Sequence, residues 1–189
     1  MAEMNRISRF FVNRFNARRN ARILRWIQAN AAIAAGAACL EIGCGNGDLA
    51  SRIVDALRPS RYVATDLDPH QLDAARRHVA ERYPRGAPSG LELREADMLR
   101  LPFGDASFDV VLGVVSIHHA SPNHRDPSRV PDALAEVDRV LRPGGRLLYE
   151  EILHKDAIRA WLTQRGYVLS GIRRGFKRES VVARKPRGS

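Results

Sequence analysis

The sequence predicts an α/β protein with a doubly wound, largely parallel sheet. Apolar runs typical of buried strands alternate with helical patterns along the 189 residues. Several of the runs are almost continuously hydrophobic, as expected of parallel strands covered on both faces. Glycine-rich or acidic segments follow the runs, where such a sheet forms its ligand crevice. With 44% hydrophobic and 28% charged residues, the chain suits one globular domain.

Seven segments are predicted as strands. They are Ala38–Ile42, Tyr62–Thr65, Leu91–Leu93, Phe108–Val115, Gly145–Tyr149, Tyr167–Ile172 and Ser180–Ala183. Few residues separate the last two runs, so we expect an antiparallel hairpin at one edge of the sheet.

Helices are predicted at Asp48–Leu57, Pro69–Tyr83, Asp132–Leu141 and Lys155–Arg165. Asp68 before a proline is a typical helix start. Gly144 and Gly145 are expected to end the third of these helices, and Gly166 to end the fourth. The connection through Leu101, Pro102 and Phe103 is short, and no helix is predicted in it.

Residues 1–36 form a basic segment in which apolar residues between Ile7 and Ile27 fall at helical spacing. Two interpretations stay open. The helix either packs its apolar side on the domain, or docks on anionic lipid with Phe10, Phe11 and Trp26 inserted. Residues 37–185 are predicted as the main domain and 186–189 as a tail.

The net charge of +10 is concentrated at the two ends of the chain. Seven arginines against Glu3 precede residue 31, and seven basic residues against Glu179 follow residue 172. Such ends favour an anionic substrate or surface.

No apolar run approaches the ~20 residues that a membrane helix needs, and no signal peptide is evident. The two cysteines, Cys39 and Cys44, cannot build a disulfide framework. We therefore expect a protein of the reducing cytoplasm, with peripheral membrane contact left open.

The stretch Cys39–Ala50, CLEIGCGNGDLA, reads as a strand, a glycine turn and a helix start. Alternating glycines let a ligand lie close to the backbone. A dinucleotide turn would read G-x-G-x-x-G, and the acids Glu41 and Asp48 would repel a pyrophosphate. These acids instead favour a cationic ligand such as S-adenosylmethionine.

Two further acids follow the next two strands. Asp66, about 20 residues past the glycines, is placed to accept hydrogen bonds from ribose hydroxyls. Asp97 could accept from an adenine amino group while Met98 covers the ring. Acids in step with three strand ends indicate one shared site.

Together with LEIGCGNGDLA, the stretches VATDLDPHQLDAAR, EADMLRLPFGDASFDVV, SIHH and LAEVDRVLRPGGRLLYEE resemble class I S-adenosylmethionine-dependent methyltransferases. The likeness is greatest to the quinone-biosynthesis group (methyltransferase type 11). The resemblance implies a Rossmann-like sheet of order 3-2-1-4-5-7-6 with the last strand antiparallel, and S-adenosylhomocysteine as product. The cofactor contacts that it implies are Glu41, Gly43, Cys44, Gly45, Asp66, Leu67, Asp97, Met98, Gly113 and Val114.

The chain departs from this pattern in two places. Residues 120–131 form a long loop, and no substrate cap separates the fifth strand from the helix at Lys155. We therefore expect an open site, with the N-terminal helix and this loop supplying substrate contacts.

His118 and His119 follow the fourth strand and are the predicted catalytic residues. His119 is the candidate for substrate contact or general base, because a hydroxyl acceptor often needs a base with a pKa near neutrality. The histidines and Glu151 match no metal-ligand spacing, so no metal is expected. Nucleic acid is not an expected partner, because SIHH replaces the Asn/Asp-Pro-Pro-aromatic motif.

The predicted function is methyl transfer from S-adenosylmethionine to a small-molecule or lipid-type acceptor. Two alternatives remain: an RNA or protein methyltransferase recruited through the basic ends, and a non-catalytic binder of the cofactor. The acceptor atom and oligomeric state are not indicated.

Overall fold

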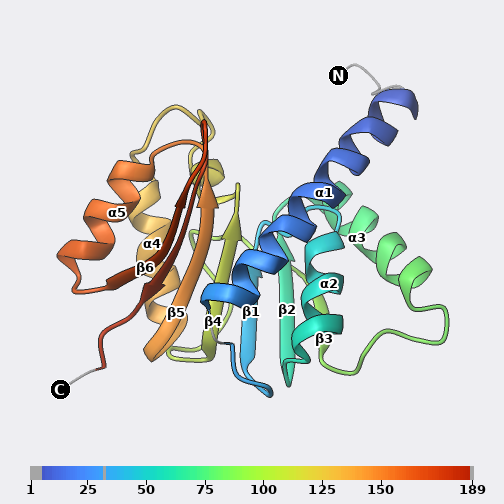
Figure 1. Cartoon of the computed structure of the whole chain (residues 1–189), viewed down its shortest axis with the longest axis horizontal. Helices are drawn as coiled ribbons and strands as arrows, with labels where there is room; N and C mark the ends of the chain where they lie inside the picture. The colour runs from blue at the N-terminus through green and yellow to red at the C-terminus, as the bar shows by residue number, and fades with distance from the viewer. Residues whose placement is uncertain (1–5, 32, 188–189) are drawn as a thin grey trace.

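A seven-stranded sheet organises the molecule, in a computed structural model that describes residues 6–31 and 33–187, with side chains from residue 17 on. The strand order β3-β2-β1-β4-β5-β7-β6 confirms the expected topology (Figure 1). Strand β7 runs antiparallel to β5 and β6, and the other pairs are parallel. The strands are β1 Ala38–Ile42, β2 Arg61–Asp66, β3 Leu91–Glu95, β4 Phe108–Val114, β5 Leu141–Glu151, β6 Val168–Arg174 and β7 Glu179–Arg184.

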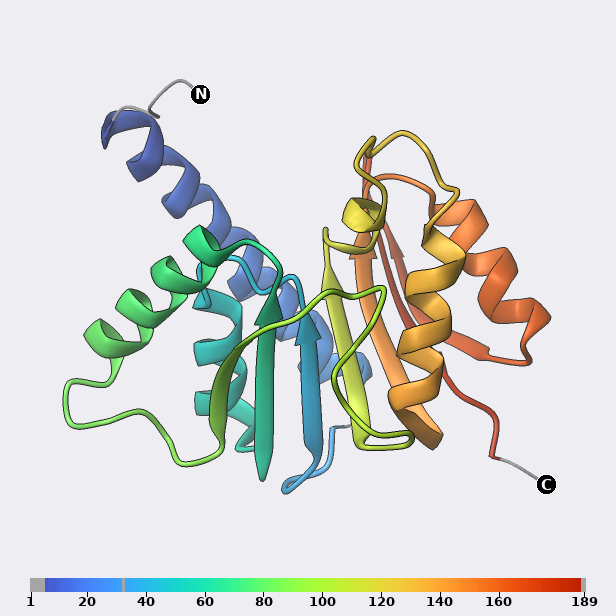
Figure 2. The same cartoon turned by 180° about the vertical axis from the view of Figure 1, so that it is seen from behind.

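Helices cover both faces of the sheet. Helices α1, α2 and α3 lie over one face and α4 and α5 over the other, as the front and back views show (Figures 1 and 2). No helix joins β3 to β4. The helices are α1 Arg6–Asn30, α2 Asp48–Leu57, α3 Pro69–Arg82, α4 Val130–Val140 and α5 Lys155–Gln164, with a 3₁₀ turn η1 at Ile117–Ala120.

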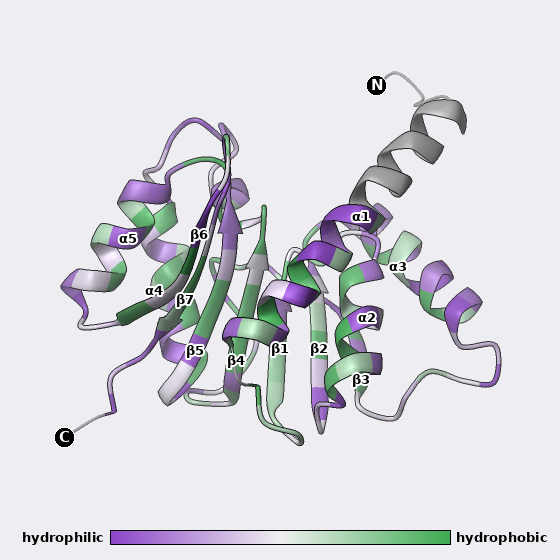
Figure 3. Ribbon diagram, in the orientation of Figure 1, coloured by the Kyte–Doolittle hydropathy of each residue, from purple (hydrophilic) through white to green (hydrophobic). Residues whose placement is uncertain are grey.

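Successive residues of a strand point to opposite faces of the sheet, and each face packs into its own hydrophobic core. The strands are therefore apolar on both sides. In β1, Cys39 packs beneath α1 and α2, whereas Leu40 and Ile42 pack toward α4 and α5. The hydropathy colouring follows this arrangement, with much of β1 and β4 green between helices whose outer sides are largely purple (Figure 3).

Most of the predicted helix ends are confirmed. The Asp68 carboxylate accepts a hydrogen bond from the His70 N–H at 2.9 Å and caps α3. Gly166, at φ +77°, donates its N–H to the Thr163 carbonyl after α5.

The predicted role of Gly144 and Gly145 is wrong, because α4 ends earlier, at Val140. Leu141 is fully buried and pairs with Phe108 of β4, so the chain enters β5 directly from the helix. Sheet pairing of a buried residue ends this helix before the glycines are reached.

The described part of α1 packs on the domain. Ile23, Trp26 and Ile27 are 0%, 7% and 1% exposed, and Trp26 Nε1 donates to the Gly171 carbonyl at 2.9 Å. Of the two interpretations, packing on the domain holds for this part of α1, and lipid insertion of Trp26 does not, because this side chain covers the sheet. The side chains of Phe10 and Phe11 lie outside the described ones. Within residues 6–31 and 33–187, no helix has the length and apolar character to cross a bilayer.

Candidate active site

A cavity of about 1180 Å³ opens at the carboxyl ends of β1, β2 and β4. Its walls come from the glycine turn after β1, the segments after β2, β3 and β4, and helices α1 and α3. The sequence-predicted residues that line it are Glu41, Gly43, Cys44, Gly45, Asp66, Leu67, Asp97, Met98, Val114 and His119. Gly113 and His118 are not part of the lining.

Two features of the turn after β1 require glycine, namely positive φ angles and a close approach to the segment after β4. Gly43, Gly45 and Gly47 have φ values of +70°, +55° and +73°, a region that costs other residues roughly 1–2 kcal/mol. A Cβ on Gly43 would also lie 2.6 Å from the Cβ of Ser116, at the end of β4. At Gly45 the nearest atom to such a Cβ would be Oε1 of Gln71 at 3.8 Å, an ordinary van der Waals distance, so a side chain would meet no clash there.

The acids that follow β2 and β3 hold their own loops and keep acceptor capacity. Asp66 accepts from the N–H groups of Gly45 and Asp68, at 2.9 and 3.0 Å. Asp97 accepts from the Leu99 N–H at 2.9 Å. A carboxylate offers about four acceptor positions, so both residues can take further donors from a ligand in the cavity.

Glu41 is a buried carboxyl at the floor of the cavity, with 2% exposure. The Tyr62 hydroxyl donates to its Oε2 at 2.8 Å. Burial raises the pKa of Glu41 to about 8, and the charges of Asp66 and Asp48 act in the same direction. The group is therefore mostly protonated at neutral pH, and a nearby cation would favour its ionised form.

Cys44 also lines the cavity, with a free thiol. Burial, and then the neighbouring Glu41, raise the pKa of this thiol well above its usual range. A thiol held in its protonated form is a poor nucleophile, so the cavity offers no thiolate chemistry here.

Glu151, at the end of β5, holds the turn that carries the histidines. Its Oε1 accepts from the N–H groups of Ser116 and Ile117, at 2.9 and 2.7 Å, and its Oε2 lies 2.7 Å from His118 Nδ1. His118 is 4% exposed and does not reach the cavity. The contacts of Glu151 with Ser116, Ile117 and His118 hold η1 in place. The next residue of η1, His119, lines the cavity.

His119 is the imidazole that a ligand in the cavity can reach. Its ring lies 4.2 Å from that of His118 and 4.3 Å from that of His124, between ring centroids. Burial, and then repulsion from these two rings, hold the pKa of His119 below its usual value. His119 is therefore neutral at pH 7 and can accept a proton.

Gly113, in β4, packs closely against the start of η1. A Cβ at this position would lie 3.2 Å from Cγ1 of Ile117 and 3.3 Å from Oγ of Ser116. Its neighbour Val114 lines the cavity instead.

Glu150 gathers arginines from three elements, an arrangement that sequence reasoning missed. This carboxylate is 1% exposed and accepts from Arg22 of α1 at 3.1 Å, from Arg173 of β6 at 3.1 Å and from Arg178 of the β6–β7 turn at 3.3 Å. The Ser180 hydroxyl also donates to it at 3.0 Å. The cluster ties α1 to the hairpin and carries an excess of positive charge.

Arg19 extends this positive region into the cavity lining. Its Nε donates to Asn20 Oδ1 at 3.1 Å, and its terminal nitrogens have no acceptor among the described residues. Burial, and then the charge of Arg178, lower the pKa of Arg19. An anion in the cavity would offset both effects by favouring the charged form of Arg19.

No group of three or more His, Cys, Asp or Glu side chains within the described ranges is arranged to hold a metal ion. Glu151, which lies beside the histidines, uses its oxygens on backbone N–H groups and on His118.

Comparison with known proteins places this geometry in a family. Residues 40–149 match the family described as methyltransferase domain. The chain is 36% identical over 122 residues to the phthiotriol/phenolphthiotriol dimycocerosates methyltransferase of Mycobacterium leprae, across 65% of this chain and 40% of that protein. It is 38% identical over 122 residues to the fatty-acid O-methyltransferase of Mycolicibacterium smegmatis, across 65% and 39%. The chain thus matches about two fifths of these relatives' length.

Solved structures share the fold at low identity. A SAM-dependent methyltransferase from Aquifex aeolicus superposes with a TM-score of 0.68 and 15% identity, over 87% of this chain and 88% of that one. A putative methyltransferase from Bacillus halodurans gives 0.68 and 18%, over 87% and 98%.

Proposed function

This chain belongs to the methyltransferase-domain family, and from that premise we propose that it transfers a methyl group from S-adenosylmethionine to an anionic, lipid-type acceptor. The observation that carries the proposal is the cavity, where Glu41, Asp66 and Asp97 surround the glycine turn. Three acids suit a cofactor that carries an ammonium group, a sulfonium and two ribose hydroxyls.

The residues present fit this cofactor. The carboxylate of Asp66 has free acceptor positions for ribose hydroxyls, and that of Asp97 for an adenine amino group. Glu41 lines the cavity where a bound ammonium would favour loss of its proton, and the backbone of Gly45, which carries no side chain, also lines it. When bound, the cofactor supplies a methyl group already activated on sulfur. The remaining contributions are Met98 against the ring, with Cys44, Leu67 and Val114 along the walls.

The anionic character of the acceptor rests on Arg19, whose positive charge lines the cavity and is followed by the half-buried arginines that surround Glu150. The mouth is open, because Pro122–Arg129 are exposed and β5 reaches α5 within a few residues. The relatives' names, which refer to dimycocerosates and fatty acids, favour a lipid-type acceptor for this chain.

His119 is proposed to contact the acceptor and, where a hydroxyl is methylated, to take its proton. A carboxylate acceptor needs no base, and His119 would then only help to exclude water and orient it. His118 acts as a positioning residue, since its bond to Glu151 holds the turn.

Contact of α1 with an anionic membrane remains a prediction for the segment that carries Phe10 and Phe11. The apolar residues of α1 after residue 22 are used against the sheet.

A labelled-methyl transfer assay tests the proposal. We would incubate the protein with methyl-labelled S-adenosylmethionine and a long-chain fatty acid, the matching alcohol, the matching amine, RNA or a basic protein. We expect label in the fatty acid or alcohol, and less than about a tenth of that turnover in Asp66→Asn, which loses charge-assisted hydrogen bonds to the cofactor. Turnover on RNA or protein, or cofactor binding without any turnover, would favour one of the two alternatives.

A further inference from the structure

The β6–β7 hairpin ends in an exposed aromatic residue. Phe176 is 95% exposed, compared with 60% for Leu67 and 56% for Val168, the next most exposed large hydrophobic residues among those described. The tip reads RRGFKR over residues 173–178, with four basic residues and no acid. We refer to residues 173–178 as the hairpin finger.

The finger projects at the end of the sheet where the cavity opens. Glu179 pairs with Glu151 at the carboxyl end of β5 and with Arg174 of β6, so the turn extends past that end. The front and back views both show the hairpin tip beside the loop that follows η1, at this end of the molecule (Figures 1 and 2).

The root of the finger is fixed, which leaves its tip presented to solvent. Arg173 and Arg178 are drawn inward to the buried Glu150. The Gly175 N–H donates to the Arg178 carbonyl at 2.8 Å and closes the turn. Phe176 is thus carried at the tip of a closed turn, where its ring is exposed to solvent.

Two cations accompany the ring at the tip. The side chain of Arg174 is 71% exposed, although it also reaches Glu179 at 3.2 Å. The Lys177 ammonium lies 5.5 Å from the centre of the Phe176 ring. An aromatic ring between exposed cations matches the bilayer interface, where apolar depth and anionic headgroups meet.

We propose that the hairpin finger docks this protein on an anionic lipid surface, with Phe176 inserted among the lipids and Arg174 and Lys177 on the headgroups. The cavity mouth then faces the bilayer, and a lipid acceptor can enter without crossing water. This route to the acceptor rests on the proposed function, whereas the docking does not. Single-stranded nucleic acid is a poorer match, because its binding sites use several aromatic platforms in succession.

Vesicle co-sedimentation tests the docking. The probe is phosphatidylcholine vesicles with or without 30% phosphatidylglycerol, and the variants are Phe176→Ser and Val168→Ser. Val168 is an exposed apolar residue of the same β6 strand, but it pairs with Arg184 at the far end of the hairpin. We expect binding to the anionic vesicles, about tenfold weaker for Phe176→Ser, since burying a phenylalanine side chain has at least this effect, and unchanged for Val168→Ser.

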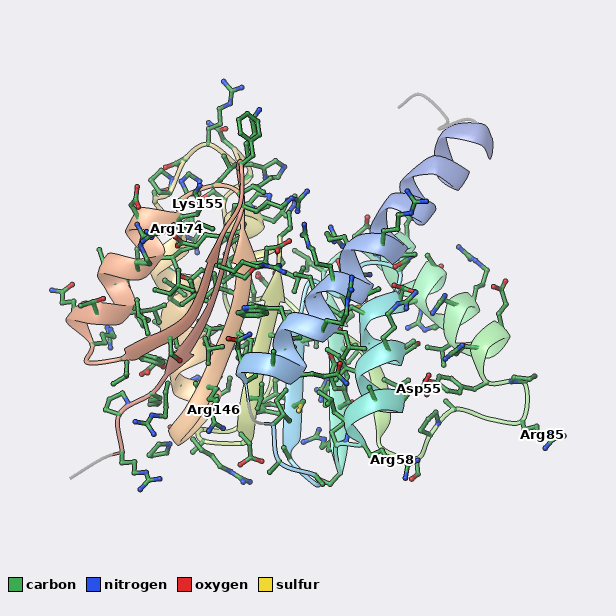
Figure 4. The ribbon with its side chains drawn as sticks, in the orientation of Figure 1. Asp55, Arg58, Arg85, Arg146, Lys155 and Arg174 are labelled. Atoms are coloured by element: carbon green, nitrogen blue, oxygen red, sulfur yellow. The ribbon has the colours of Figure 1, made fainter. Side chains whose placement is uncertain are left out.

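The charged residues give a second arm. A Lys177→Glu substitution should weaken binding to anionic vesicles by about fivefold or more. Arg146→Glu is the control, because Arg146 lies at the opposite end of the sheet from Arg174 (Figure 4). Equal binding by Phe176→Ser and the wild type, or equal losses in both charge variants, would overturn the proposal. So would a loss of RNA binding in Phe176→Ser when the wild type ignores vesicles.

Turnover separates this inference from the proposed function. On a short-chain acceptor in solution, Phe176→Ser should keep wild-type kcat, and on acceptor held in vesicles it should lose about tenfold in kcat/KM, in step with binding. Finger-dependent vesicle binding without methyl transfer would refute the proposed function and leave the docking intact. Methyl transfer by a protein whose vesicle binding does not depend on the hairpin finger would refute the docking and leave the proposed function intact.

Discussion

Replacing Gly43 with alanine adds one carbon atom where the turn after β1 meets the segment after β4. The new Cβ would lie 2.6 Å from the Cβ of Ser116, closer than two such atoms approach in proteins. Gly43 also has a φ of +70°, which disfavours any side chain. The substitution therefore combines backbone strain with overpacking, and it does so in the wall of the cavity.

The expected loss of stability can be worked out from these two parts. A residue in the left-handed region costs roughly 1–2 kcal/mol. An extra methyl in a packed site costs about 1–3 kcal/mol. We therefore expect Gly43→Ala to lower the free energy of unfolding by about 2–5 kcal/mol. Gly36→Ala is the matched control, because Gly36 has a φ of +83° and a Cβ there would meet nothing within 4 Å, so its cost should stay near 1–2 kcal/mol.

Urea unfolding of the two variants gives the comparison, and a second substitution isolates the clash. Ser116→Gly removes the opposing Cβ, and the Ser116 hydroxyl has no hydrogen-bond partner among the described residues. The double variant Gly43→Ala/Ser116→Gly should recover the overpacking part, as a coupling of about 1–3 kcal/mol. Equal losses for Gly43→Ala and Gly36→Ala, or no coupling with Ser116, would refute the close approach.

Three further predictions concern the charged and titrating residues. Glu150→Gln should destabilise the protein by about 1.5–3 kcal/mol, because three arginines that are 35–43% exposed lose their charge-assisted hydrogen bonds to the buried carboxylate. Glu92→Gln removes an exposed pair with Arg61 and should cost less than about 1 kcal/mol in the same urea assay. Similar losses in the two variants would contradict the cluster. Because the pKa of Glu41 is about 8 in the folded protein and 4.5 ordinarily, the free energy of unfolding should fall as pH rises through this window. Urea unfolding at several pH values should show no such contribution in Glu41→Gln, and an unchanged slope would reject the buried protonated form. His119→Ala should lower kcat by about 10²–10⁴-fold on a hydroxyl acceptor with cofactor affinity unchanged by calorimetry, whereas full activity would exclude a general base.

Much of the fold could be predicted because strands and helix starts are specified by residues that are close together in the sequence. Near-continuous apolar runs located the strands, and Asp68 marked a helix start through its own side chain. Strand β5 is longer than expected, from Leu141 rather than Gly145, because pairing with β4 extends it. Such pairing depends on residues far away in the sequence, and no local pattern carries it.

The site was predictable to a similar depth. Acids at the ends of β1, β2 and β3 were expected around one cavity, and the structure brings Glu41, Asp66 and Asp97 to it. The hydrogen bonds of Glu150 and Glu151 were not predicted, because the partners can lie far apart in the sequence. Glu150 and Arg22, for example, are separated by 128 positions. The sequence left Trp26 open to lipid contact because burial of one helix face cannot be read from its own spacing. The sequence did contain one indication of these bonds, because Glu150 and Glu151 are adjacent acids at the end of an apolar strand.

Titration calorimetry with S-adenosylmethionine and S-adenosylhomocysteine measures directly whether the acid-lined cavity binds this cofactor. We expect each compound to bind in a one-to-one ratio, and Asp66→Asn to weaken the binding of both by about 10–150-fold, because one or more charge-assisted hydrogen bonds are lost. At pH 7 the binding heat of S-adenosylmethionine should change with the ionisation enthalpy of the buffer, as Glu41 releases its proton. No heat from either compound, or binding of a dinucleotide in their place, would contradict the account.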